Sequence, residues 1–190
     1  MQKLIFQRKN FYKNYHSDDI IEFLNIERNL LENPTVQQMK NYRQHYDSSC
    51  YSHCLEVAYL SYLFCKKYNL DYVSAARAGM LHDLFLYDWR HSKKRLHLQR
   101  FHAFIHPQIA LENASKLIDL NDKEKDIILK HMWPVTFFSF PKYKESFIIT
   151  ITDKISALKS FHRYYKKRLI SSKIYKYAYI FLVSFVFNIL

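Results

Sequence analysis

The sequence predicts an all-α protein, a helical bundle, on three observations. Its 190 residues include one glycine, Gly79, and four prolines, too few for a sheet protein with many tight turns. Residues that start helices recur at close intervals along the chain. Apolar residues follow these starts at helical spacing. At this length we expect one domain with a sizeable core, followed by a tail.

The first two helices are predicted from their N-terminal residues. Ser17 is a suitable N-cap for a helix over about residues 18–31, which carries apolar residues such as Phe23 and Leu30. Asn33 followed by Pro34 predicts a second helix, to about residue 45, because proline is tolerated at the first helical position.

Five further helices are expected, at about residues 48–70, 71–81, 107–117, 121–131 and 143–160. Ser48 or Ser49 opens the first of these, and Asp71 caps the second. Pro107 starts the third. Asn121, with a glutamate three residues on, forms a capping-box pattern for the fourth.

The chain is basic, with a net charge of +12, which favours anionic partners such as nucleotides, nucleic acid or acidic lipid. Its single glycine excludes the glycine-rich phosphate loops of P-loop and dinucleotide-binding folds. Residues 87–106 form one long irregular stretch rich in lysine, arginine and histidine. Such a loop could cover an anionic substrate, and a solvated charged loop is the alternative.

Composition changes near residue 165. We expect a folded domain over 1–165 with an N-terminal helical extension, and a basic then apolar C-terminal helix over 166–190. Residues 154–176 carry eight Lys or Arg and no acid, and residues 177–190 are almost wholly apolar. Fourteen residues span roughly 21 Å as a helix, short of the ~30 Å hydrocarbon core of a bilayer. Two interpretations stay open: the tail contacts a membrane surface, or it packs on the bundle or on a partner chain.

The three cysteines, Cys50, Cys54 and Cys65, are an odd number within one helix-like segment, which is not a disulfide framework. The N-terminus shows no signal-peptide pattern, because basic residues interrupt its short apolar stretch. A cytoplasmic location is therefore expected, peripheral to or anchored in the membrane if the tail meets it.

Charged and imidazole side chains interrupt three segments that otherwise have the pattern of buried helix. His53 shares a helix face with Val57 and Leu60, the doublet His82-Asp83 ends an apolar run, and Asp153 stands among apolar residues. Buried charge is costly unless it is paired or bound to metal. Imidazole and carboxylate together suit Mn, Fe, Co or Zn ions. A lone His53 would more often be an ordinary core residue, but a shared metal site explains all three anomalies.

These positions resemble the H…HD…D pattern of the HD superfamily of metal-dependent phosphohydrolases. Residues 51–58 (YSHCLEVA) resemble its first motif, 75–83 (AARAGMLHD) its second and 151–157 (ITDKISA) its last. The likeness covers roughly residues 41–161. It implies an all-α HD-domain helical bundle that binds divalent metal ions, of Mn, Fe, Co, Zn or Mg, one or two per chain.

Two more histidines resemble those by which some HD subgroups bind a second metal, including HD-type dinucleoside tetraphosphate hydrolases and cyclic-dinucleotide phosphodiesterases. They are His106 and His131. The resemblance implies that one ion is bound by His53, His82, Asp83 and Asp153, and the other by Asp83, His106 and His131, with Asp83 bridging. Alternatives are an ordinary loop histidine for His106 and a helix C-cap for His131. His102 is a competing ligand.

The implied reaction is cleavage of a phosphoester or phosphoanhydride through metal-activated water, with Asp83 as the central catalytic residue. Arg77 and Lys154 are candidates for phosphate contact, and a structural ion pair is the alternative for each. We expect a small phosphorylated substrate, a nucleotide, and no specific nucleic acid. The chain lacks the Gly-Tyr-Pro signature of the cyclic-dinucleotide enzymes and the Glu-Asp pair of the stringent-response hydrolases, which leaves the substrate open.

Two other functions stay open. One is an inactive HD-fold binding or regulatory module. The other is a basic protein that associates with membrane or nucleic acid and whose histidines are incidental. The sequence leaves oligomeric state undetermined.

Overall fold

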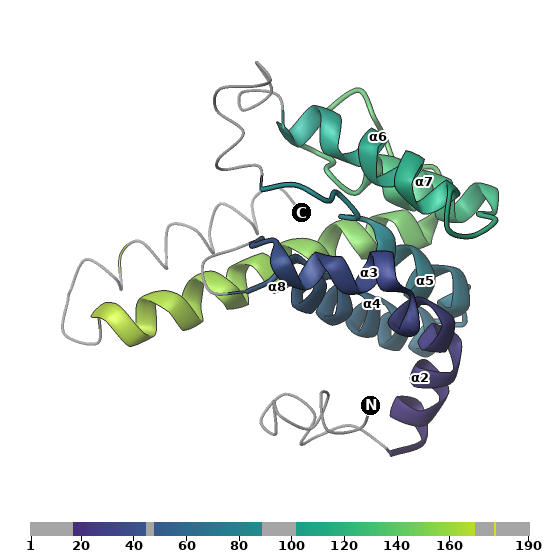
Figure 1. Cartoon of the computed structure of the whole chain (residues 1–190), viewed down its shortest axis with the longest axis horizontal. Coiled ribbons are helices and arrows are strands. Elements are labelled where there is room, and N and C mark those ends of the chain that lie inside the picture. The colour runs from purple at the N-terminus through teal and green to yellow at the C-terminus, as the bar shows by residue number, and fades with distance from the viewer. Residues whose placement is uncertain (1–16, 45–47, 89–101, 170–176, 178–190) are drawn as a thin grey trace.

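Two helices, α4 (Cys50–Lys67) and α5 (Tyr72–Leu81), pack side by side through the centre of the protein. The long helix α8 (Lys144–Leu169) lies against α4 and also contacts α5. On the other side of α5 lies α2 (Ser17–Glu32), and α6 (His102–Ser115) packs beside α7 (Asp122–Lys130) at one end of the bundle (Figure 1). The site described below lies where α4 to α8 meet.

The computed structural model describes residues 17–44, 48–88 and 102–169, together with Tyr177. Within these ranges the secondary structure is helical, with no strand beyond an isolated bridge between Arg43 and Ser49. Two short elements complete the described chain: α3 (Pro34–Gln38) and the 3-10 helix η1 (Met39–Asn41). The prediction of an all-α fold is confirmed.

The predicted helix starts are largely confirmed by their caps. The Asn33 side chain accepts hydrogen bonds from Thr35 N and Val36 N, as expected for an N-cap before proline. The Ser49 and Asp71 side chains cap α4 and α5 in the same way. Asn121 forms the predicted capping box at α7 with Glu124.

The second predicted helix is wrong in its extent, because α3 ends at Gln38 rather than near residue 45. The chain tightens into η1, and Tyr42 then adopts an extended conformation. The Tyr42 carbonyl accepts a hydrogen bond from Cys50 N at 2.8 Å, and Gln44 N donates to Ser48 O at 3.0 Å. These backbone bonds turn the chain back to the start of α4, which a continued helix could not do.

The predicted start at Pro107 is also wrong, because α6 begins at His102 and contains the proline. Pro107 is the sixth residue of α6, past the first turn, so it removes one intrahelical hydrogen-bond donor at a cost. The extra turn is supported by aromatic packing: the His102 and His106 rings stack with centroids 4.7 Å apart, and both contact Phe85.

At the other end of the chain, α8 continues to Leu169, beyond the predicted end at Ser160.

The core is one continuous cluster of apolar side chains to which every helix from α2 to α8 contributes. Its largest fully buried members include Phe23, Tyr59, Tyr62, Phe85, Met80 and Ile149. Cys50, Cys54 and Cys65 are buried and form no disulfide, as expected of small apolar residues. The polar atoms of the site are embedded in this apolar surround.

Several predictions fall outside the described residues. They concern the N-terminal residues 1–16, the middle of the basic stretch at 89–101, and the tail after residue 169 except for Tyr177. None of the helices in the described part of the chain combines the length and the apolar character needed to cross a bilayer.

Candidate metal centre

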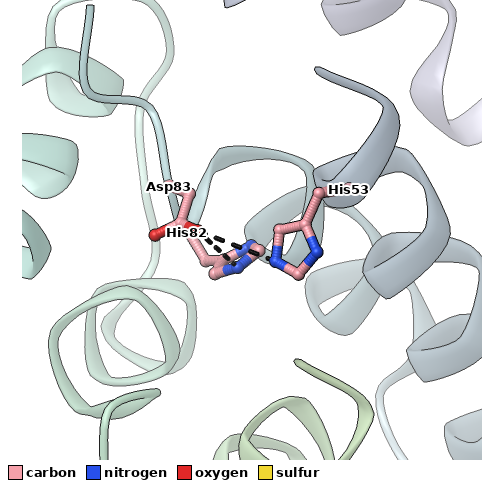
Figure 2. Close-up of side chains that lie close together, drawn as sticks. All are labelled: His53, His82 and Asp83. Atoms are coloured by element: carbon pink, nitrogen blue, oxygen red, sulfur yellow. Dashed lines mark ion pairs between the residues drawn. The ribbon is translucent and has the colours of Figure 1, made fainter. Parts of the chain in front are cut away.

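The six residues that the sequence predicts as metal ligands lie together where five helices meet. Asp83, directly after α5, lies at the centre of the group. Figure 2 shows its carboxylate close to the rings of His53, from α4, and of its chain neighbour His82. The other three are His106 in α6, His131 at the C-terminal end of α7 and Asp153 in α8. The structure therefore brings all six into one cluster.

The first half of the cluster surrounds the Oδ2 atom of Asp83. His82 Nε2 lies 3.4 Å and His53 Nε2 lies 3.7 Å from this oxygen. Asp153 presents its Oδ1 atom to the same two nitrogens, 3.0 Å from His53 and 3.8 Å from His82. Both carboxylates thus face the same two imidazole nitrogens; Asp83 lies close enough to form a metal-holding set with them, and Asp153 stands outside that set in the described residues.

The second half surrounds the other oxygen of the same carboxylate. His106 Nε2 lies 3.2 Å and His131 Nε2 lies 3.5 Å from Asp83 Oδ1. The two Nε2 atoms lie 2.9 Å from each other. Asp83 therefore gives one oxygen to each half and connects them.

The ring orientations leave the Nε2 atoms directed inward. The Nδ1 atoms of His82, His106 and His131 each lie 2.8 Å from a backbone carbonyl oxygen of their own segment, those of Gly79, His102 and Ile128. A carbonyl oxygen can only accept, so each Nδ1 carries the hydrogen and the neutral ring has its lone pair on Nε2. This is the arrangement by which proteins orient histidine ligands.

Two of the inward atoms have no hydrogen-bond partner among the described residues: His82 Nε2 and Asp83 Oδ1. Both residues are almost wholly buried. Leaving buried polar atoms unsatisfied is costly, and so is the approach of two imidazole lone pairs. A cation between the inward atoms removes both costs.

The distances fit a shared cation. Two donors bound to one ion at ~2.1 Å lie about 3.0 Å apart in octahedral and about 3.4 Å apart in tetrahedral coordination. The seven donor separations given above run from 2.9 to 3.8 Å. Two sets of donor atoms lie close enough to hold a metal, one from His53, His82 and Asp83, the other from Asp83, His106 and His131. The residues present therefore fit one or two divalent ions.

The electrostatics keep both carboxylates charged. Burial raises the pKa of Asp83, but the neighbouring imidazoles of His82, His106 and His131 outweigh it and hold this pKa well below its usual range. The Asp153 side chain is 14 % exposed, and burial raises its pKa as well. The facing imidazoles of His53 and His82 outweigh the effect of burial and hold the pKa of Asp153 well below its usual value. The centre is therefore anionic, as a cation site requires.

Two residues that contact the cluster were missed by the sequence analysis. Gln44 Nε2 donates a hydrogen bond to Asp83 Oδ2 from the irregular segment before α4. Ser156 Oγ lies 3.2 Å from His53 Nδ1. Nothing in the pattern around Gln44 marks it, whereas Ser156 lies one turn after Asp153 on the same helix face and could have been found from that spacing.

The two predicted phosphate-contacting residues differ in position. Lys154 is half-buried, with Nζ 3.2 Å from Thr150 O and 3.5 Å from His131 O, beside the cluster. Burial lowers its pKa, and Asp153 opposes this shift. Arg77 instead pairs with Glu124 at 3.3 Å, the structural alternative weighed from the sequence. For Arg77, contact with phosphate stays a prediction.

The competing ligand, His102, lies at the edge of the cluster. Its Nδ1 atom lies 3.1 Å from the Tyr87 hydroxyl, and its ring stacks on His106. Burial, with a smaller contribution from the His106 charge, lowers the pKa of His102 to about 4. His102 thus supports His106 and is absent from both sets of candidate ligands in the described residues.

Comparison with known families gives one match. The family model described as HD domain matches residues 50–158, more than half of the chain. Neither the curated proteins nor the solved structures contain a match to this sequence. The matched range contains all six clustered residues.

Proposed function

The chain belongs to the HD-domain family, and on that basis we propose that it is a divalent-metal-dependent phosphohydrolase acting on a small phosphorylated anion. Members of this family are generally metal-dependent hydrolases, and the buried His/Asp cluster fits divalent metal ions. The observation that carries the proposal is the central position of Asp83. Its two oxygens face separate pairs of imidazole Nε2 atoms, at 3.2 to 3.7 Å.

We assign the ligands as two sets that share Asp83. His53, His82, Asp83 and Asp153 would hold one ion, and Asp83, His106 and His131 the other. When bound, such ions supply a water of lowered pKa and positive charge against the phosphoryl oxygens. Phosphoryl transfer depends mainly on positioning and electrostatics, so no nucleophilic side chain is required.

The protein's own residues would orient this centre. Backbone carbonyls accept from the Nδ1 atoms of three histidines, and Gln44 donates to Asp83 Oδ2, so the inward atoms are held in place before any substrate arrives. Lys154 presents an ammonium group beside Asp153 and His131, where it would contact a phosphate. We keep Arg77 as a weaker candidate for that contact, since its guanidinium is already bonded to Glu124 and to Asp119 O.

The substrate we propose is a nucleotide, cleaved at a phosphoester or a phosphoanhydride. The net charge of +12 supports an anionic substrate. The absence of glycine-rich phosphate loops supports binding through metal and basic side chains. The three buried, unpaired cysteines support a cytoplasmic location for the reaction.

The test compares metal content and hydrolysis in the wild type and in Asp83→Asn, which keeps the size of the side chain and removes its charge. Asp122→Asn is the matched control, because the Asp122 side chain is 90 % exposed on α7. We expect the wild type and the control to bind metal and to hydrolyse a generic phosphodiester, and Asp83→Asn to lose both. Equal hydrolysis by Asp83→Asn and wild type would reject the proposed enzyme.

A nucleotide panel then addresses the substrate. Turnover of a nucleotide that stops on addition of chelator is the expected result. Bound metal without turnover of any phosphorylated compound would favour the inactive regulatory module instead. Anion binding that weakens steeply with salt and does not change on addition of chelator would favour the basic protein that associates with membrane or nucleic acid.

A further inference from the structure

The loop between α7 and α8 carries aromatic side chains that point to solvent. We define it as the aromatic loop, residues 132–143. Phe138 is 99 % and Phe137 is 70 % exposed, and their rings contact each other with centroids 5.7 Å apart. Val135 and Phe140 are also more than half exposed. Exposed apolar patches of this kind mark interaction sites in soluble proteins.

The aromatic loop is an ordered platform. Trp133 N donates to Lys130 O at 3.0 Å, and Ser139 N donates to Thr136 O at 2.8 Å, so successive turns hold its backbone. At its far end, Lys142 N donates to Asp126 Oδ2 at 2.9 Å. The Trp133 ring contacts Phe140 and also Phe147 of α8. The phenylalanine pair is therefore presented outward from an anchored base.

The exposed charges beside the aromatic loop are positive, because the two nearest carboxylates, Asp126 and Glu145, are buried and paired with Lys130 and Lys123. Residues 127–144 contain three lysines and no acid. Lys142 and Lys144 are exposed, and neither pairs with a carboxylate within the described residues. The third, Lys130, pairs with Asp126 at 2.7 Å. Two unpaired ammonium groups thus flank the exposed phenylalanines.

We propose that the aromatic loop inserts into the interface of an anionic lipid bilayer. Exposed aromatic rings bury their apolar faces at the level of the headgroups, and neighbouring lysines are attracted to anionic lipid. This combination favours a bilayer over a protein groove, because the rings are exposed and the neighbouring lysines complement a negatively charged surface. The net charge of +12 acts in the same direction over the whole chain.

Trp133 provides a local reporter in the full-length protein. The chain has two tryptophans, Trp89 and Trp133, so Trp89→Phe leaves only the one in the aromatic loop. In this background we would measure flotation with vesicles of phosphatidylcholine alone or mixed with phosphatidylserine. Quenching of Trp133 emission by brominated acyl chains requires this loop to enter the bilayer. Attachment of the protein through another segment would leave Trp133 unquenched.

The variants are Phe137→Ser/Phe138→Ser and Lys142→Gln/Lys144→Gln. The control is Ile21→Ser/Tyr68→Ser, which removes two large apolar side chains outside the loop that are also more than half exposed, at 57 % and 59 %. With vesicles that contain phosphatidylserine, we expect quenching of Trp133 emission both in the Trp89→Phe protein and in the control variant. The phenylalanine variant should bind at least about tenfold more weakly, and the lysine variant should lose the preference for phosphatidylserine.

Four results would overturn the proposal. The first is unquenched Trp133, the second is wild-type binding by the phenylalanine variant, and the third is equal binding to vesicles that lack phosphatidylserine. The fourth is a protein that light scattering shows to be dimeric and that the phenylalanine variant converts to a monomer, because the loop would then bind a second copy of the chain. All variants keep residues 166–190, so a contribution of the tail is the same in each.

Discussion

Gly79 of α5 and Ala58 of α4 approach so closely that a Cβ atom on Gly79 would lie 2.8 Å from the Ala58 Cα atom. It would also lie 3.2 Å from the Ile149 side chain of α8. The only glycine of the chain therefore sets the distance between the helix that carries His53 and the helix that leads to His82. Its carbonyl oxygen also accepts from His82 Nδ1.

Gly79→Ala should destabilise the protein, because the added methyl group must push α5 away from backbone atoms of α4. Overpacking of this kind costs roughly 1–3 kcal/mol. At an exposed helical position the same substitution would stabilise by about 1 kcal/mol through helix propensity. The sign of the change in the free energy of unfolding, measured in urea, separates the two. A stabilised Gly79→Ala variant would contradict the close approach.

Ser156→Ala should weaken metal binding without unfolding the protein. The serine hydroxyl lies 3.2 Å from His53 Nδ1, and loss of such a partner typically lowers metal affinity about 10- to 100-fold. Ser160→Ala is the control, since Ser160 is also buried and lies one turn further along α8. Competition with a fluorescent chelator measures the affinity. Equal affinities of the two variants would show that Ser156 does not orient the ring.

His106→Ala should reduce the number of bound ions by one, if the two ligand sets each hold an ion as we propose. It removes a member of the second set and leaves His53, His82 and Asp153 in place. Asp83→Asn should lower the amount of metal bound by each of the two ligand sets, because both sets use an oxygen of Asp83. Metal analysis of purified protein by mass spectrometry measures the content. An unchanged metal content in His106→Ala would mean that the second set does not bind an ion.

Glu27 of α2 should make stability fall as the pH rises. This side chain is wholly buried, and its carboxylate oxygens have no hydrogen-bond partner among the described residues. Burial raises its pKa from 4.5 to about 8, with Arg77 opposing and Glu124 reinforcing the shift. The folded state therefore holds a proton that the unfolded state releases. The stability is fully present below pH 4.5 and is lost progressively as the pH rises to about 8.

Glu27→Gln should remove this slope, whose maximum is about 1.4 kcal/mol per pH unit for one proton. Glu32→Gln, at an exposed position of the same helix, is the control and should keep the slope. Urea midpoints between pH 5 and pH 9 provide the measurement. Parallel curves for Glu27→Gln and wild type would mean that Glu27 is ionised in the folded state.

The fold and the clustering of the candidate ligands were accessible from the sequence for a physical reason. Asp71 and Asn121 are typical N-cap residues, and their side chains form the local hydrogen bonds that start α5 and α7. Such starts can be predicted from the sequence. His53, His82 and Asp153 stand in apolar helical segments, and such positions face the same core. Their convergence follows from the packing of those apolar faces. That they bind metal stays a prediction.

What the sequence did not reveal depends on contacts between distant segments. Gln44 reaches Asp83 only because the chain leaves α3 early and forms backbone bonds with the start of α4, and no local pattern encodes this return. The start of α6 was misplaced because Pro107 is a strong local signal. The stacking of His102, His106 and Phe85 outweighs it, and that stacking requires the tertiary structure.

The shared carboxylate of Asp83 has a consequence for how the centre would respond to its supply of ions. If Asp83 helps to hold two cations, as we propose, their mutual repulsion would weaken the binding of the second ion. Occupancy would then rise in two steps as free metal increases, with the protein half-loaded over the interval between them. If the proposed hydrolysis needs both ions, its rate would follow the weaker step, and it would fall with the supply of metal before the stability of the fold does.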